Sequence, residues 1–201
     1  ALDISGQVRE AGNILAIEVF PQKPGDFGLG FVDWNPPAPD KNMGIWRDVY
    51  LHISGDVSLE HAWVRTDKIT DTPSEASLSV FASLQNHTTE TITGTLKGKS
   101  EIFSFSIPVT LKAGETREIQ VDPSDEGSLK GKNPLLWWCN GMGDPNLYNL
   151  DLSFETGEDV SDQLSLPFGI RKIETFTTPA GHKGFKLNGR EVLIRGAGWT
   201  D

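Results

Sequence analysis

The chain has 201 residues, and its 21 glycines and 12 prolines favour many turns and short strands over long helices. Its formal net charge of −10 argues against a nucleic-acid backbone or an anionic membrane surface as a partner, and is compatible with a neutral or cationic one. The single cysteine, Cys139, excludes an internal disulfide framework and a multi-cysteine zinc site, and no apolar run has membrane-spanning length. We therefore expect an all-β protein.

Two strands are predicted in the first domain, which we place at residues 1–55. Asn13–Phe20 is β-branched and apolar and follows a turn signal. Ile45–Ile53 alternates with apolar residues in both sets, which indicates a strand covered on two sides.

A loop with three prolines separates these strands within the stretch Phe31–Leu51 and displays Asp33, Trp34, Asp40 and Asn42. Two interpretations are open. The loop is either a rigid recognition loop that presents polar groups, or a surface turn with a packed tryptophan.

Residues 56–172 contain roughly seven short strands between polar turns, which is typical of an immunoglobulin-like β-sandwich. The predicted strands are Val57–Val64, Leu78–Leu84, Thr91–Leu96, Phe103–Leu111, Arg117–Val121, Tyr148–Phe154 and Leu164–Ile170. In the first of them, Val57, Leu59 and Trp63 fall in one alternating set. The strict alternation of Phe103–Leu111 predicts one buried and one wet face, and Pro108 favours an edge position because proline cannot donate to a ladder. The antibody cysteine pair is missing, so strand count and spacing alone carry this assignment.

The segment Leu135–Leu150 contains the adjacent Trp137 and Trp138 followed by Gly-x-Gly. The two rings could form an aromatic platform for a sugar, or they could anchor a long crossing loop onto the sandwich and a neighbouring domain. We favour the anchor, because adjacent aromatic residues in a strand point to opposite faces. Cys139 is expected in a core beside them.

A β-hairpin is predicted at Phe185–Ile194, with Asn188-Gly189 as its turn. Its second arm ends in the continuous apolar run Val192-Leu193-Ile194, as expected of a strand buried on both faces in a parallel sheet or barrel. Residues 173–201 would then begin a further domain, and both chain ends read as cuts through a longer protein.

Catalytic and metal-binding patterns are missing from the sequence. The four histidines, His52, His61, His87 and His182, lack metal-ligand spacing. Nothing surrounds Asp33, Asp40 or Asp48 with the apolar walls that raise the pKa of a catalytic acid, so we assign them no catalytic role and treat them as binding groups. We expect no catalytic residue, no metal and no cofactor in this chain.

Several separate segments resemble glycoside hydrolase family 2. They are Asn13-Ile-Leu-Ala-Ile, Asp33-Trp34-Asn35, Gly44-Ile-Trp-Arg-Asp-Val49, Asn133-Pro-Leu-Leu-Trp-Trp138, Pro145-Asn-Leu-Tyr148, Phe168-Gly-Ile-Arg171 and Leu187-Asn-Gly-Arg-Glu-Val-Leu-Ile-Arg-Gly196. The resemblance covers nearly the whole chain. It implies the C-terminal part of a jelly-roll domain, a complete immunoglobulin-like sandwich and the start of a truncated (β/α)₈ catalytic barrel.

Within the family, the exo-β-D-glucosaminidase branch is the most similar, through Val32-Asp-Trp-Asn35, Asn42-Met-Gly-Ile45, Gly141-Met-Gly143 and Gly196-Ala-Gly-Trp-Thr200. The β-mannosidase branch is the runner-up. The β-galactosidase and β-glucuronidase branches typically have Asn-x-His-Glu just after the Arg-Gly that ends the last segment, and this chain has Ala197-Gly-Trp-Thr-Asp201 instead.

The resemblance implies a retaining exo-β-glycosidase whose two catalytic glutamates lie beyond residue 201, so the fragment itself would be inactive. Asp33 and Trp34 would reach into the sugar subsite of the barrel, and Trp199 would lie at its rim. The implied partners are a terminal β-linked sugar, such as an amino sugar, and the missing barrel, and we expect an extracytoplasmic location. The alternative is a stand-alone carbohydrate-binding or interaction module without catalysis.

Overall fold

The structure is a computed structural model, and it describes residues 2, 4–20, 44–45, 47–70, 74–123 and 129–196. The chain divides into two compact units, Ala1–Leu51 with Gly196–Asp201 and His52–Arg195. No helix in these described ranges is long and apolar enough to cross a membrane.

The described part of the first unit has one regular element, the 3₁₀ turn η1 (Ser5–Gln7). Asn13–Phe20 forms no strand, and Ile14 near its start is 92% exposed. The described residues of Ile45–Ile53 also lie outside any strand. Both strand predictions are therefore wrong for this structure. A β-branched run becomes a strand only when a neighbouring backbone pairs with it, and the described residues of this unit provide no such ladder.

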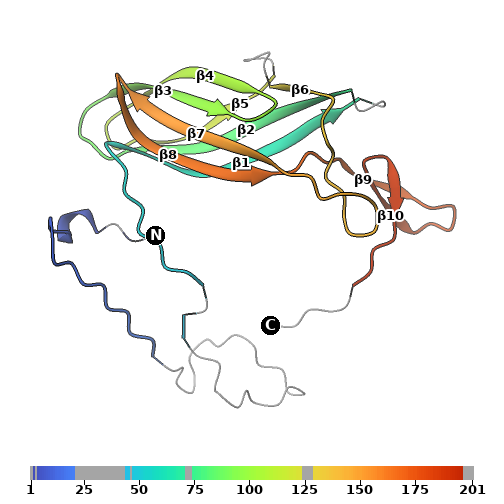
Figure 1. Ribbon diagram of the computed structural model, residues 1–201, viewed down its shortest axis with the longest axis horizontal. Helices are drawn as coiled ribbons and strands as arrows, with labels where there is room; N and C mark the ends of the chain where they lie inside the picture. The colour runs from blue at the N-terminus through green and yellow to red at the C-terminus, as the bar shows by residue number, and fades with distance from the viewer. Residues whose placement is uncertain are drawn as a thin grey trace. The chain divides into compact units, whose positions relative to one another are not determined.

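The second unit is an all-β structure of antiparallel sheets (Figure 1). Its strands are β1 (Val57–Ile69), β2 (Glu75–Asn86), β3 (Ile92–Lys99), β4 (Ser104–Leu111), β5 (Thr116–Val121), β6 (Lys130–Lys132), β7 (Tyr148–Thr156), β8 (Asp159–Phe168), β9 (Ile173–Thr177), β10 (Lys183–Leu187) and β11 (Arg190–Val192). The first sheet has the order β1-β2-β5, with β6 also pairing β2, and the second has the order β4-β3-β7-β8. These two sheets form the predicted sandwich.

The core lies between the two sheets and consists of the inward residues of each strand. The fully buried side chains include Leu59, Leu78, Leu84, Leu96, Leu111, Leu150 and Phe154. In β4, Phe105, Val109 and Leu111 are buried while Ser104, Ser106 and Thr110 are exposed. Within the described chain β4 pairs with β3 alone, which confirms the edge position predicted from Pro108.

The third sheet has the order β11-β10-β9 and contains the predicted hairpin. Leu187 pairs with Arg190, and the two turn residues Asn188 and Gly189 have φ of 51° and 81°. Two positive φ angles define a type I′ turn, which Asn-Gly favours. Strand β9 was not predicted.

The predicted second arm is too long, because β11 ends at Val192 and both Leu193 and Ile194 are exposed. An inner strand of a parallel sheet or barrel pairs on both edges, and among the described residues β11 pairs with β10 only. The finer division of the chain into domains 1–55, 56–172 and 173–201 stays a prediction.

Candidate functional site

The three residues predicted to bind substrate, Asp33, Trp34 and Trp199, lie outside the described residues. The same holds for Asp40 and Asn42 in the proline-rich loop. Their substrate-binding role stays a prediction, and the candidate sites below are those of the described part of the chain.

The Trp137–Trp138 segment joins the sandwich to the third sheet. The Trp137 N–H donates to the carbonyl of Ile170 at 2.9 Å, just after β8. The Trp137 carbonyl in turn accepts a hydrogen bond of 2.9 Å from Nδ2 of Asn188, in the β10–β11 turn. Oδ1 of Asn188 accepts from the Lys172 N–H at 2.8 Å. One asparagine amide therefore ties three distant segments together.

An arginine guanidinium group lies over each of the two tryptophan rings. The Cζ atom of Arg171 lies 4.5 Å from the centroid of the Trp137 ring, and that of Arg190 lies 5.0 Å from the Trp138 ring. These cation–π contacts connect the crossing loop to the chain after β8 and to β11. The contacts favour the anchor over the sugar platform for these two rings. Cys139 is free and only partly buried, so the expectation that it lies in a core is wrong. In the Gly-x-Gly run, Gly143 lies against the Trp138 ring, where a Cβ atom would be 2.8 Å from Cδ1 and Cγ of the indole.

A groove with a volume of about 540 Å³ lies where the edges of β1 and β8 face each other at one side of the sandwich. Its walls include Trp63 and Arg65 from β1, Trp137 from the crossing loop, and Arg171. Leu147 and Ile173, which also line it, are both exposed. The groove therefore combines indole rings, aliphatic side chains and guanidinium groups.

Trp63 reaches the outer surface because β1 contains a bulge. The pairing register shifts between Glu60 and Trp63, so three residues of β1 pass two of β2. Alternation places Trp63 on the side of Leu59, and the bulge moves it to the opposite, outer face. There its ring stacks on Phe81, with centroids 4.0 Å apart and 5° between the planes.

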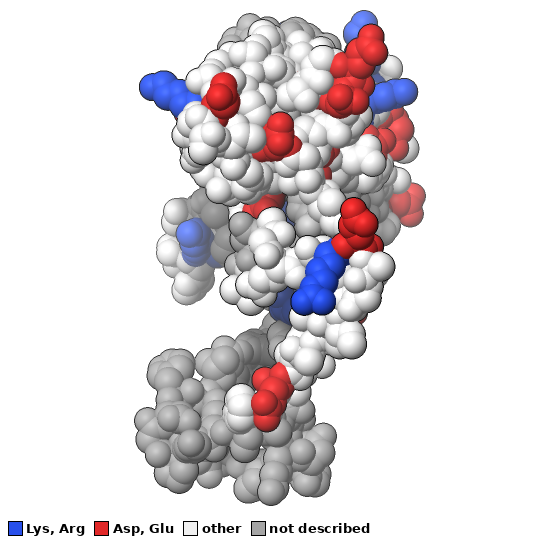
Figure 2. Space-filling model, turned by 90° about the vertical axis from the view of Figure 1, so that its left-hand side faces the viewer, with Lys and Arg blue, Asp and Glu red and all other residues white. Residues whose placement is uncertain are grey.

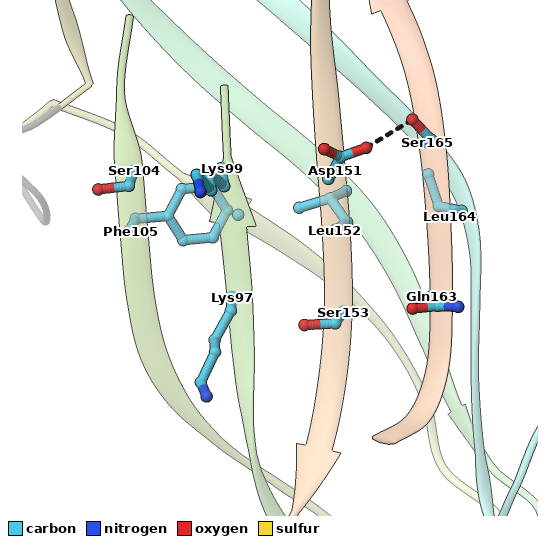
Figure 3. A pocket seen from close by; sticks show the side chains of 11 residues that line it. Lys97, Lys99, Ser104, Phe105, Asp151, Leu152, Ser153, Gln163, Leu164 and Ser165 are labelled. Carbon is cyan, nitrogen blue, oxygen red and sulfur yellow. Dashed lines mark hydrogen bonds between the residues drawn. The ribbon is translucent and has the colours of Figure 1, made fainter. Parts of the chain in front are cut away.

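A second hollow, of about 710 Å³, lies on the β4-β3-β7-β8 sheet (Figure 3). Its polar lining residues are Lys97, Lys99, Ser104, Asp151, Ser153, Gln163 and Ser165. Asp151 is held in place because its Oδ1 accepts from the Ser165 hydroxyl at 2.6 Å and from Nδ2 of Asn149 at 3.0 Å. Phe105, the aromatic residue of this lining, is buried, so it offers no open ring face to a sugar.

Charged side chains of both signs lie on the surface of the sandwich (Figure 2). On the face of the sandwich visible in Figure 2, acidic and basic side chains are scattered rather than gathered into one patch. Lys97 pairs with Glu155, and this hydrogen bond is the main cause that lowers the pKa of the Glu155 carboxyl. A single-sign field of the kind that attracts nucleic acid is not visible on this face.

The described histidines have structural partners or lie in solvent. His52 Nε2 lies 3.0 Å from Oδ1 of the buried Asp162, and His87 Nε2 lies 2.8 Å from the Ser58 hydroxyl. Among the described residues, no three His, Cys, Asp or Glu side chains are placed to hold a metal ion.

Sequence comparison identifies the class of protein to which this sandwich belongs. Residues 57–171, more than half of the chain, match the model of the glycosyl hydrolases family 2, so the chain belongs to that family.

Comparison with individual proteins shows which members of the family this chain is similar to. An exo-β-D-glucosaminidase of Streptomyces avermitilis is 38% identical over 200 residues, covering 99% of this chain and 22% of that protein. A mannosylglycoprotein endo-β-mannosidase of Lilium longiflorum is 32% identical over 184 residues, covering 83% of this chain and 18% of that protein. The crystal structure of the exo-chitosanase CsxA of Amycolatopsis orientalis superposes with a TM-score of 0.72 at 32% identity, over 86% of this chain and 20% of that one. The chain thus spans about one fifth of the length of the relatives it matches.

Proposed function

We propose that this chain is the non-catalytic β-sandwich portion of a retaining exo-β-glycosidase that removes terminal β-linked glucosamine units, with β-mannosides as the alternative substrate. The observation that carries the proposal is the 38% identity to an exo-β-D-glucosaminidase over 99% of this chain. The β-mannosidase relative matches a smaller share of the chain at lower identity. The activity belongs to the whole protein, of which this chain supplies an accessory part.

In this proposal the chemistry takes place in the catalytic barrel. Retaining glycosidases use two carboxyl groups, one as the nucleophile and one as the acid/base, placed about 5 Å apart across the scissile bond. The family resemblance puts both glutamates after residue 201. The sandwich and the third sheet then act as a rigid frame, joined by Asn188 and the arginine–tryptophan contacts.

The proline-rich loop is the part of this chain that we propose to touch the substrate. Asp33 would accept hydrogen bonds from sugar hydroxyls or from the ammonium group, and Trp34 would present a flat apolar face. Trp199 would form the rim of the same subsite.

The substrate is tested by assaying the full-length protein that carries this chain on aryl β-glucosaminide, β-mannoside and β-galactoside. The glucosaminide is expected to give the highest kcat/KM. A higher value with the mannoside would move the protein to the runner-up branch, and galactoside as the best substrate would overturn the proposal.

The loop is tested by Asp33→Ala in the full-length protein. We expect kcat/KM on the best substrate to fall tenfold or more, which is about 1.4 kcal/mol for one lost polar contact to the transition state. Asp159→Ala, at the exposed first residue of β8, is the matched control and should leave kcat/KM unchanged. If kcat/KM is the same for both variants, Asp33 has no role in substrate binding and belongs to an ordinary surface turn.

A stand-alone carbohydrate-binding module is the second candidate, and the polar hollow of Figure 3 is the feature that favours it. Sugar-binding surfaces usually combine polar groups with an exposed aromatic ring, and this hollow lacks an open ring face. Calorimetric titration of the 201-residue chain with chitosan oligosaccharides separates the two candidates. We expect only weak binding, whereas tight binding would support the module.

A further inference from the structure

Trp63 is an exposed tryptophan in the middle of a long strand, and its ring is held in one orientation. The residue is 47% exposed, although it lies well inside β1. Its indole lies parallel to the Phe81 ring at 4.0 Å, so one face is covered and the rest of the exposed surface is open to solvent.

Neighbouring side chains on β1 and β2 hold the stack in place through a series of contacts. The guanidinium Cζ of Arg65 lies 4.8 Å from the Phe81 centroid. Nε of Arg65 donates to Oδ1 of Asp67 at 2.6 Å, and the Ser79 hydroxyl donates to Oδ2 of the same carboxylate at 2.6 Å. These side chains already have fixed partners. A ligand that stacks on Trp63 therefore immobilises few freely rotating side chains, so the conformational entropy cost of binding is small. The positive charge of Arg65 is also balanced by Asp67.

Two carboxylates share the outer face with the stack. Trp63 lies opposite Phe81, and in the next row Glu60 lies opposite Ser83, which lies opposite Glu118 on β5. Neighbouring rows on one face of a sheet are about 7 Å apart. Glu60 is therefore one row from the indole, and Glu118 lies in that same row but two strands away from β1, about 10 Å across the sheet. The Glu60 side chain is 43% exposed, and Nε2 of the exposed His61 lies 3.7 Å from its Oε2.

We propose that the Trp63–Phe81 stack is a secondary binding surface for a chain of β-linked glucosamine units, outside the catalytic subsite. The apolar C–H face of a pyranose ring covers the indole, and the ammonium group at C2 interacts with Glu60 or Glu118. The inference deepens the proposed function and rests on it for the choice of sugar.

Three observations favour an amino-sugar chain over a neutral sugar or an apolar protein surface. Carboxylates flank the ring in a neighbouring row of the sheet. The net charge of −10 attracts a polycation over a longer range. The groove of about 540 Å³ that Trp63 also lines extends the surface towards Trp137, which leaves room for more than one unit.

The test measures retention of the full-length protein on chitosan by affinity electrophoresis, with hydrolysis of a small aryl β-glucosaminide as a second readout. Trp63→Ala is expected to weaken retention about threefold or more and to leave kcat/KM on the small substrate unchanged. Trp63→Phe keeps a ring and should recover part of the retention. Val160→Ala removes an exposed apolar side chain from the other sheet and serves as the matched control.

The charge component is tested by Glu60→Gln and Glu118→Gln. Each is expected to weaken retention on chitosan, and the double variant should also reduce its salt dependence. Equal retention of wild type and both variants on chitosan and on an uncharged β-mannan would overturn the assignment to an amino sugar.

Failure of this inference is distinguishable from failure of the proposed function. If the aryl glucosaminide is not hydrolysed but Trp63→Ala still weakens retention on chitosan, the proposed function fails and the surface stands. If hydrolysis is observed and Trp63→Ala binds chitosan like wild type, the surface is overturned. A lower melting temperature of Trp63→Ala with unchanged retention would mark Trp63 as a contact to another part of the protein, which also overturns it.

Discussion

Asn86 is a fully buried polar residue at the end of β2, with 0% of its surface exposed. Its Nδ2 donates to the carbonyls of Glu90 at 2.7 Å and Lys112 at 2.9 Å, and its Oδ1 accepts from the Thr88 N–H at 2.9 Å. Asn86-His87-Thr88 matches a glycosylation sequon, but the amide nitrogen that a glycan would need is used inside the fold. The residue is structural.

Asn86→Ala is therefore expected to lower the free energy of unfolding by about 3 kcal/mol, because it removes a fully buried amide together with its hydrogen bonds to the carbonyls of Glu90 and Lys112. Urea unfolding measures the loss. Asn149→Ala removes an exposed amide of the same kind and should cost less than about 1 kcal/mol. Similar losses in the two variants would contradict the role assigned to burial.

Glu115 couples stability to pH. The Lys112 N–H donates to its Oε2 at 2.7 Å, and Arg117 Nη2 donates to Oε1 at 2.7 Å. The hydrogen bond from Lys112 and then that from Arg117 lower the pKa of Glu115 from its usual 4.5. A lowered folded-state pKa means that the charged form stabilises the fold above pH 4.5, and that this contribution is lost as the pH falls through the folded-state pKa.

The expected result is that the melting temperature falls less steeply for Glu115→Gln than for wild type between about pH 6 and about pH 3. Differential scanning calorimetry across this range checks it. Parallel curves for the two proteins would show that Glu115 titrates alike in the folded and unfolded chains.

At the scale of the strands, the sandwich could be predicted because apolar and polar residues alternate along each strand. The seven predicted strands correspond to β1 to β5, β7 and β8, and among the described strands of the two sandwich sheets only the short β6 was not predicted. The bulge in β1 was also missed. The bulge depends on the pairing register of β1 against β2, and the sequence of β1 alone does not specify that register.

Gly94 in β3 shows how closely the strands pack against the core. A Cβ atom there would lie 2.5 Å from the carbonyl oxygen of Glu155 and 2.5 Å from Cζ of Phe154. Gly94→Ala is expected to lower the melting temperature by about 4 °C or more, because backbone and a core ring must both move. Gly6→Ala has nothing within 4 Å of the added atom and should leave the melting temperature of the sandwich unchanged. A tolerated Gly94→Ala would mean that β7 shifts without cost.

At the scale of the whole chain, the Asn188 amide joins the third sheet to the sandwich through Trp137 and Lys172. Asn188→Gly keeps the positive φ of the turn and removes both side-chain hydrogen bonds. We expect faster hydrogen exchange in β9, β10 and β11 and unchanged exchange in β2 and β7. Lys183→Ala, at the far end of β10, is the control. Uniform exchange across the unit in Asn188→Gly would show that the packing of the rings alone holds the junction.

The proline-rich loop within Phe31–Leu51 shows what a local motif can and cannot establish. The motif around Asp33 and Trp34 pointed to the correct family, but these residues lie outside the described part of the chain. The candidate surface at Trp63 gave no signal in the sequence, because its partners Phe81 and Glu118 come from other strands.

The sequence by itself determined the all-β class, the strands of the sandwich, the edge position of β4 and the Asn188-Gly189 turn. Each of these follows from residues that are neighbours along the chain, through side-chain alternation or allowed φ angles. Only the tertiary structure decided which face Trp63 occupies, what Asn188 binds, and that Asn13–Phe20 forms no strand here. These features depend on pairing between segments that are distant in the sequence. An apolar pattern indicates that a segment can form a strand, but it does not specify the partner strand or the register of the pairing.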